Sequence, residues 1–112
     1  VVALARATAS EVWTDALPEL MEMDLRHAVP RIGVPALVVV GELDRVTPPA
    51  AAIQLTGALP DGRLAVISSA GHIPMLDHAD RFLAELRPFV AEVLRGEPRK
   101  RTRRRKPREG AA

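Results

Sequence analysis

"VPALVVVGELDRVTPP", residues 34–49 of this 112-residue chain, decides the fold. Its apolar centre, residues 36–41, is short, continuous and rich in β-branched side chains. Such a run is typical of a strand that is buried on both faces, in a parallel sheet beneath helices. A loop follows, and because proline is tolerated at first helical positions, Pro48 and Pro49 predict a helix that runs to about Leu59.

The same order of elements is repeated further along the chain. "RLAVIS", residues 63–68, predicts a second strand, and "SAGHIPM", residues 69–75, predicts a loop. The apolar stripe of residues 79–95 predicts an amphipathic helix, with Gly96 as its stop. Strands that alternate with helices imply an α/β fold with a parallel sheet. Because a lone pair of strands is marginal in water, we expect this sheet to be incomplete.

Residues 1–30 have a helical pattern. Ser10 is a suitable N-cap for a helix that starts one residue later. Pro18 interrupts the apolar stripe, so one bent helix and two short helices that meet near this proline are both open. Residues 27–35 contain two prolines and a glycine and predict no regular element.

The composition narrows the class of protein. Apolar residues make up 47% and charged residues 27% of the chain, which is compatible with a packed core. The lack of cysteine excludes disulfides, thiolate metal ligands and a cysteine nucleophile, and it fits the reducing cytoplasm, where we expect the protein. No stretch is long and apolar enough to cross a bilayer. The sequence does not begin with Met and has no signal-peptide pattern, so we expect a fragment or a processed product.

Charge is divided unevenly along the chain. Residues 1–96 carry 8 Lys/Arg against 12 Asp/Glu, whereas residues 97–112 carry 8 against 2. This basic tail has no large apolar side chain, so we expect it to be a disordered, solubilising extension. Binding of the tail to a polyanion is the alternative. Without aromatic side chains to stack on bases, the tail gives no sign of specific nucleic-acid recognition.

Two residues that can carry chemistry follow the predicted strands. Asp44 comes after the first strand and His72 after the second. Ligands of parallel α/β sheets bind at the carboxyl ends of the strands, so we expect both side chains to meet at that edge. A carboxylate beside an imidazole fixes the ring tautomer and stabilises the imidazolium, and the pair therefore predicts a general base. The structural alternative is that Asp44 only caps the next helix or binds Arg45.

The other titratable candidates lack such a context. We expect His27 and His78 to face solvent. Asp77, His78 and Asp80 superficially resemble a metal cluster. Acidic residues at the start of a helix are more often capping groups, so no metal site is predicted.

These strand and loop units resemble the C-terminal part of the α/β hydrolase family, over about residues 24–95. In that family the acid of the catalytic triad precedes the histidine, and both follow late strands of the sheet. The stretch from Gly41 to Asp44 matches the G-x-x-D of the acid loop, and Gly71–His72 matches the histidine loop.

The chain also departs from the family pattern. The family's nucleophile lies in a G-x-S-x-G elbow upstream of the acid. None of the three serines, Ser10, Ser68 and Ser69, has that context. Asp77 and Ala79 stand where relatives usually have Glu and Pro, and we expect this change to affect the start of the helix rather than the chemistry.

The resemblance implies the C-terminal portion of an α/β-hydrolase fold, with parallel strands, flanking helices and an incomplete sheet. In that interpretation residues 1–30 are the helical end of a cap or lid region. Residues 31–96 are the C-terminal segment of the hydrolase core, and residues 97–112 are the disordered basic tail.

The implied activity is hydrolysis of a small ester or lactone by a Ser-His-Asp triad whose serine lies upstream of this chain. Asp44 orients the imidazole, and His72 acts as general base and then as general acid. Val46, Ile73 and Met75 line the substrate pocket, with ordinary core packing as the alternative. No cofactor is implied, and the isolated chain is expected to be inactive. The alternatives are a non-catalytic fragment and a binding module with a polyanion-binding tail.

Overall fold

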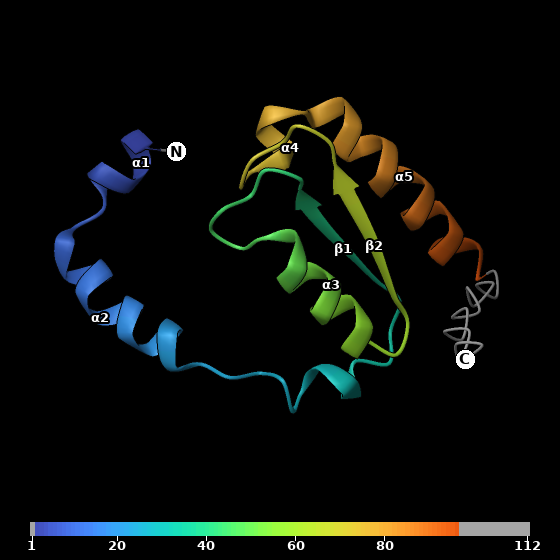
Figure 1. Cartoon of the computed structure of the whole chain (residues 1–112), viewed down its shortest axis with the longest axis horizontal. Helices are drawn as coiled ribbons and strands as arrows, with labels where there is room; N and C mark the ends of the chain where they lie inside the picture. Colours follow the sequence, from blue (N-terminus) through green and yellow to red (C-terminus); the bar gives the residue numbers. More distant parts are fainter. Residues whose placement is uncertain (1, 97–112) are drawn as a thin grey trace, which may run out of the picture.

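The computed structural model describes residues 2–96, and Figure 1 shows the arrangement of its elements. The basic tail, for which we expected disorder, lies outside the described residues. In chain order the elements are α1 (Val2–Ala7), α2 (Ser10–Glu22), the 3-10 turn η1 (Val29–Arg31), β1 (Ala36–Gly41), α3 (Pro49–Ala58), β2 (Gly62–Ile67), α4 (Pro74–Asp77) and α5 (Ala79–Arg95).

The two strands form a parallel pair, as the sequence predicts. Their register runs from Ala36 opposite Gly62 to Gly41 opposite Ile67, so both strands end at the same edge. Helix α3 connects them, and α3 and α5 lie on either side of the strands in Figure 1. The loops that follow β1 and β2 therefore leave the sheet side by side.

The core is small and made of small side chains. Its buried apolar residues, all on the sheet, on α3 or in the loop after β2, are Val40, Ala52, Ala65, Ile67 and Ala70. We expected β1 to be buried on both faces, and this expectation is wrong for most of the strand, where Val40 is the only buried apolar side chain. The physical reason is that a two-stranded sheet with few flanking elements leaves parts of its two faces and both of its edges uncovered.

Helix α2 differs from the expected start of the chain. It passes through Pro18 as one helix, so the alternative of two helices that meet at this proline is wrong. The N-cap is Ala9, and Ser10 is already helical, with its carbonyl oxygen accepting the Thr14 hydroxyl at 3.0 Å. Every residue of α2 is exposed, and Figure 1 shows α1 and α2 standing apart from the sheet.

Helix α5 has the predicted bounds and ends at Gly96, whose φ of 64° is left-handed and suits a residue without a Cβ. An ion pair between Arg63 of β2 and Glu92 fixes the helix to the sheet. The Arg63 guanidinium also lies 5.8 Å from the centroid of the Phe89 ring. The short elements η1 and α4 were not predicted, because both lie in proline-containing segments that the sequence marks as loops. Within residues 2–96, none of the helices has the length and apolar character that a bilayer crossing requires.

Candidate functional site

Asp44 is the one buried charged residue among those described, with 6% of its surface exposed. It lies in the loop after β1, where its Oδ1 accepts the backbone N–H groups of Val46 at 2.9 Å and Thr47 at 3.0 Å. Its Oδ2 accepts the Thr47 hydroxyl at 3.0 Å. The carboxylate therefore organises its own loop, with both oxygens held in fixed positions, and it does not cap α3, whose N-cap Pro48 has no side-chain hydrogen bond.

The structure brings His72 to the same carboxylate. The loop after β2 places His72 Nδ1 3.0 Å from Asp44 Oδ2, although 28 positions separate the two residues. The His72 side chain is 48% exposed, whereas that of Asp44 is 4% exposed. The pair thus combines a buried acid with an imidazole that reaches the surface.

The electrostatics of the pair follow from its hydrogen bonds. Burial raises the pKa of Asp44, but hydrogen bonds from His72, from Thr47 and from the Val46 backbone outweigh burial and lower this pKa to about 2. Asp44 is therefore a carboxylate at neutral pH, and its Oδ2 accepts a hydrogen bond from the Nδ1–H group of His72. That assignment leaves the lone pair of His72 on Nε2, which is the arrangement of a general base.

The two loops meet because their backbones pack directly against each other. The Leu43 N–H donates to the Ala70 carbonyl oxygen at 2.9 Å. A Cβ on Gly41 would lie only 2.1 Å from the Gly71 carbonyl oxygen, so glycine alone fits there. This close approach brings Asp44 within reach of His72.

Side chains from outside the pair hold the loop that precedes His72. Ser69 has a φ of 60°, an uncommon left-handed conformation for a residue with a Cβ. Its N–H donates to Glu42 Oε2 at 2.8 Å. Arg81 of α5 donates to the Ser68 carbonyl oxygen at 2.8 Å. No local pattern in the sequence indicates these contacts, because they join segments that are far apart along the chain.

One expectation about this region is wrong. His78 does not simply face solvent, because it is half-buried and its Nε2 lies 3.3 Å from the Ser69 carbonyl oxygen. His27 is exposed, as expected. Asp77 is the last residue of α4, and its Oδ2 accepts the N–H of Gly71, the residue before His72, at 3.2 Å. Among the described residues no cluster of His, Cys, Asp or Glu could hold a metal ion.

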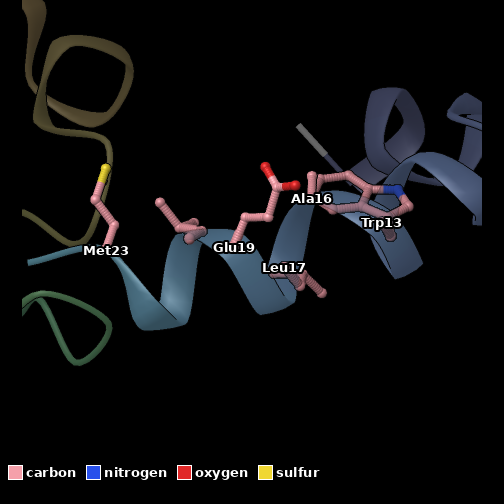
Figure 2. A pocket seen from close by; sticks show the side chains of 6 residues that line it. Trp13, Ala16, Leu17, Glu19 and Met23 are labelled. Carbon is pink, nitrogen blue, oxygen red and sulfur yellow. The ribbon is translucent and has the colours of Figure 1, made fainter.

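Of the three predicted pocket residues, two lie in the loops after β1 and β2, and the third, Met75, lies in the short helix α4. Val46 is 70% exposed and Met75 is 46% exposed, while Ile73 is half-buried and precedes α4. A separate open hollow lies on α2, as Figure 2 shows, and is lined by other residues. Its lining residues are Trp13, Ala16, Leu17, Glu19, Leu20 and Met23.

Comparison with known proteins identifies relatives of this chain. The profile of a family described as alpha/beta hydrolase fold matches residues 8–79. A pimeloyl-[acyl-carrier protein] methyl ester esterase of Neisseria meningitidis serogroup A is 40% identical over 99 residues, which cover 88% of this chain and 31% of that protein. A protein of the same name from Xanthomonas oryzae is 35% identical over 76% of this chain and 34% of its own length. The chain thus spans about a third of the length of these curated relatives.

Solved structures show the same likeness. An alpha/beta hydrolase enzyme from a lagoon-sediment metagenome of Mar Chica, Morocco, superposes with a TM-score of 0.62 at 29% identity. The match covers 65% of this chain and 33% of that one. A thermophilic esterase from Thermogutta terrifontis has a TM-score of 0.61 at 28% identity, over 62% of this chain and 26% of its own. The fold class expected from the sequence is confirmed, including the incomplete sheet.

Proposed function

The chain belongs to the α/β hydrolase fold family, and we propose that it carries the acid and the histidine of an ester-hydrolysing catalytic triad. The observation that carries the proposal is the 3.0 Å contact between His72 Nδ1 and Asp44 Oδ2 at the carboxyl edge of a parallel pair of strands. The serine of this triad is proposed to lie N-terminal to residue 1. The sequence lacks a G-x-S-x-G elbow, and the relatives are about three times longer than the matched part.

The proposed reaction uses His72 twice. Its Nε2 accepts the proton of the serine hydroxyl while the serine oxygen attacks the ester carbonyl carbon. The imidazolium then gives this proton to the departing alcohol, leaving an acyl-enzyme. A water molecule next loses a proton to Nε2 and attacks the acyl carbon, and the imidazolium returns the proton to the serine oxygen as the acid leaves. Asp44 stays ionised throughout and stabilises the imidazolium through Nδ1–H.

The proposed substrate is a small ester or lactone. The relatives named above are esterases of a pimeloyl methyl ester, which supports an acyl ester as the substrate class. Val46, Ile73 and Met75 are proposed to line the acyl site, because each lies within three positions of Asp44 or His72 along the chain. No step of the proposed reaction requires a cofactor.

Residues 1–30 are proposed to be the helical end of a cap over the site. The support is the apolar surface of α2, where Trp13, Leu17 and Leu20 are all exposed in the described part of the chain. An amphipathic helix with an uncovered apolar face is suited to pack against a further layer of protein. Residues 31–96 are proposed to be the C-terminal segment of the hydrolase core.

The test is hydrolysis of p-nitrophenyl acetate and p-nitrophenyl butyrate by the longer protein that contains this sequence. His72→Ala is expected to lower kcat by roughly 10⁶-fold, as removal of a triad base does. The 112-residue chain alone is expected to show no turnover. Turnover by that isolated chain that disappears with His72→Ala would contradict the upstream nucleophile, and full activity of the longer His72→Ala protein would contradict the triad.

A further inference from the structure

We propose that Thr47 is a positioning residue of the Asp44–His72 pair, whose hydroxyl locks the carboxylate in the orientation that the imidazole needs. The inference deepens the proposed function and rests on it for its catalytic consequence. The geometry of the Asp44–His72 pair does not depend on the proposed function.

The Thr47 hydroxyl touches both members of the pair. Its Oγ1 donates to Asp44 Oδ2 at 3.0 Å and lies 3.4 Å from His72 Nδ1. A hydroxyl has one proton and two lone pairs. With the proton given to Oδ2, a lone pair of Oγ1 remains directed to Nδ1–H, which also donates to Oδ2 at 3.0 Å. The hydroxyl, the carboxylate and the imidazole, which come from two loops, therefore lie in mutual contact.

The hydroxyl adds something that the backbone of the same residue cannot supply. Asp44 Oδ1 is held by the N–H groups of Val46 and Thr47, and any two residues other than proline at these positions could supply those donors. Oδ2 is the oxygen that meets the imidazole, and its partners are Thr47 Oγ1 and His72 Nδ1. The last torsion of an aspartate side chain is soft. Without the hydroxyl, the backbone N–H groups on Oδ1 still resist this rotation, but the half-exposed ring is the one partner left on Oδ2.

The consequence concerns the tautomer of His72. A carboxylate locked in the plane of the ring selects the Nδ1–H tautomer and keeps Nε2 free to accept a proton. A carboxylate that rotates about its last bond selects this tautomer less strongly. Loss of the Thr47 hydroxyl is therefore expected to lower the fraction of rings that are competent as a base, and to leave substrate binding unchanged.

Two substitutions separate the hydroxyl from packing. Thr47→Val keeps the shape of the side chain and removes the hydroxyl, whereas Thr47→Ser keeps the hydroxyl and removes a methyl group. Thr56→Val is the matched control, because the Thr56 hydroxyl donates to the Ala52 carbonyl oxygen within α3, away from the pair. Thermal unfolding by circular dichroism is measured on all three variants, so that any loss of folding is seen separately.

The first measurement is the ¹⁵N chemical shift of the His72 ring nitrogens in the 112-residue chain, which has only three histidines to assign. The Nδ1–H tautomer is expected to dominate in the original chain, in Thr47→Ser and in Thr56→Val. It is expected to give way to a mixture in Thr47→Val. Identical ring shifts in Thr47→Val and the original chain, or a larger change in Thr47→Ser than in Thr47→Val, would overturn the inference.

The second measurement is ester hydrolysis by the longer protein. Thr47→Val is expected to lower kcat about tenfold with KM unchanged, which is less than the roughly 10²- to 10⁴-fold contribution of a general acid or base itself, and Thr47→Ser is expected to restore it. Failure of the inference about Thr47 can be distinguished from failure of the proposed function. If His72→Ala abolishes activity but Thr47→Val changes neither kcat nor the ring shifts, the inference is wrong and the proposed function stands. If the ring shifts change but no variant affects activity, the positioning stands and the proposed function is wrong.

Discussion

The loops at the carboxyl edge of the sheet are held by many contacts, whereas helix α2 buries none of its residues. At the edge, the carboxylate of Asp44 is surrounded by donors from two loops, and the backbone of Gly41 touches that of Gly71. Helix α2 has a strong apolar stripe but no buried residue. The difference teaches that the contacts which hold Asp44 and His72 together lie within the described residues, whereas the apolar face of α2 is left exposed there.

The two regions also differ in how far local sequence signals predict them. The apolar run that ends at Gly41 and the G-H pair at His72 are local signals, and they are sufficient to predict both strands and a pair at one edge. The roles of Glu42 and Arg81, and the approach of Thr47 to His72, could not be found in this way. Their contacts depend on how two turns pack in three dimensions, and no spacing along the chain encodes that packing.

The position of α2 was unpredictable for another physical reason. Its stripe of apolar side chains predicted a helix, and a helix is present. An apolar stripe indicates that one face of a helix can be buried, but it does not indicate which surface covers that face. The expected burial of β1 was wrong for the same reason, since the pattern of a strand describes the neighbours it needs rather than those this chain supplies.

The largest expected effect on stability comes from a substitution that forces apart the two loops at the carboxyl edge of the sheet. In Gly41→Ala the new Cβ would lie 2.1 Å from the Gly71 carbonyl oxygen, so the two loops must move apart. We expect the free energy of unfolding to fall by about 3 kcal/mol, the upper end for overpacking. Gly33→Ala is the control, because no atom lies within 4 Å of its added Cβ. Urea unfolding followed by circular dichroism measures both, and equal stability of the two variants would contradict the close approach of the loops.

A second prediction concerns acid. The pKa of Asp44 is lowered from 3.8 to about 2 in the folded chain, so between these values the native state binds fewer protons than the unfolded state. The stability that this carboxylate contributes is therefore fully present above pH 3.8 and is lost as the pH falls through about 2. Arg26 also lowers the pKa of Asp24, in the segment after α2, so protonation of Asp24 in acid has to be separated from protonation of Asp44.

The comparison with Asp44→Asn isolates the contribution of the edge. Because Asp24 is present in both proteins, its effect cancels in the difference between them. We expect the difference in unfolding midpoint between the original chain and Asp44→Asn to be constant from about pH 7 to about pH 4 and to shrink towards about pH 2. A difference that stays constant throughout this range, or grows, is incompatible with a lowered pKa for Asp44.

The smallest expected effect compares an ion pair of the sheet with an ion pair in the segment after α2. The Arg63–Glu92 pair joins β2 to α5, and its side chains are 37% and 30% exposed, so solvent screens it substantially. Glu92→Gln is expected to lower the free energy of unfolding by about 0.5 kcal/mol at low salt, and by less at high salt. The Asp24–Arg26 pair is more exposed, and Asp24→Asn is expected to produce no measurable change. Urea unfolding at both salt concentrations measures the two variants, and a larger loss of stability in Asp24→Asn than in Glu92→Gln would reverse the contrast between the two regions.

The central claim is that Asp44 and His72 act as one unit, and a double-mutant cycle on ester hydrolysis by the longer protein tests it most directly. We predict that Asp44→Asn and His72→Ala each lower kcat/KM by several orders of magnitude, and that the double variant is no worse than His72→Ala alone, because residues that work as a unit are strongly non-additive. Losses that multiply in the double variant, or an Asp44→Asn protein with unchanged kcat/KM, would contradict the account.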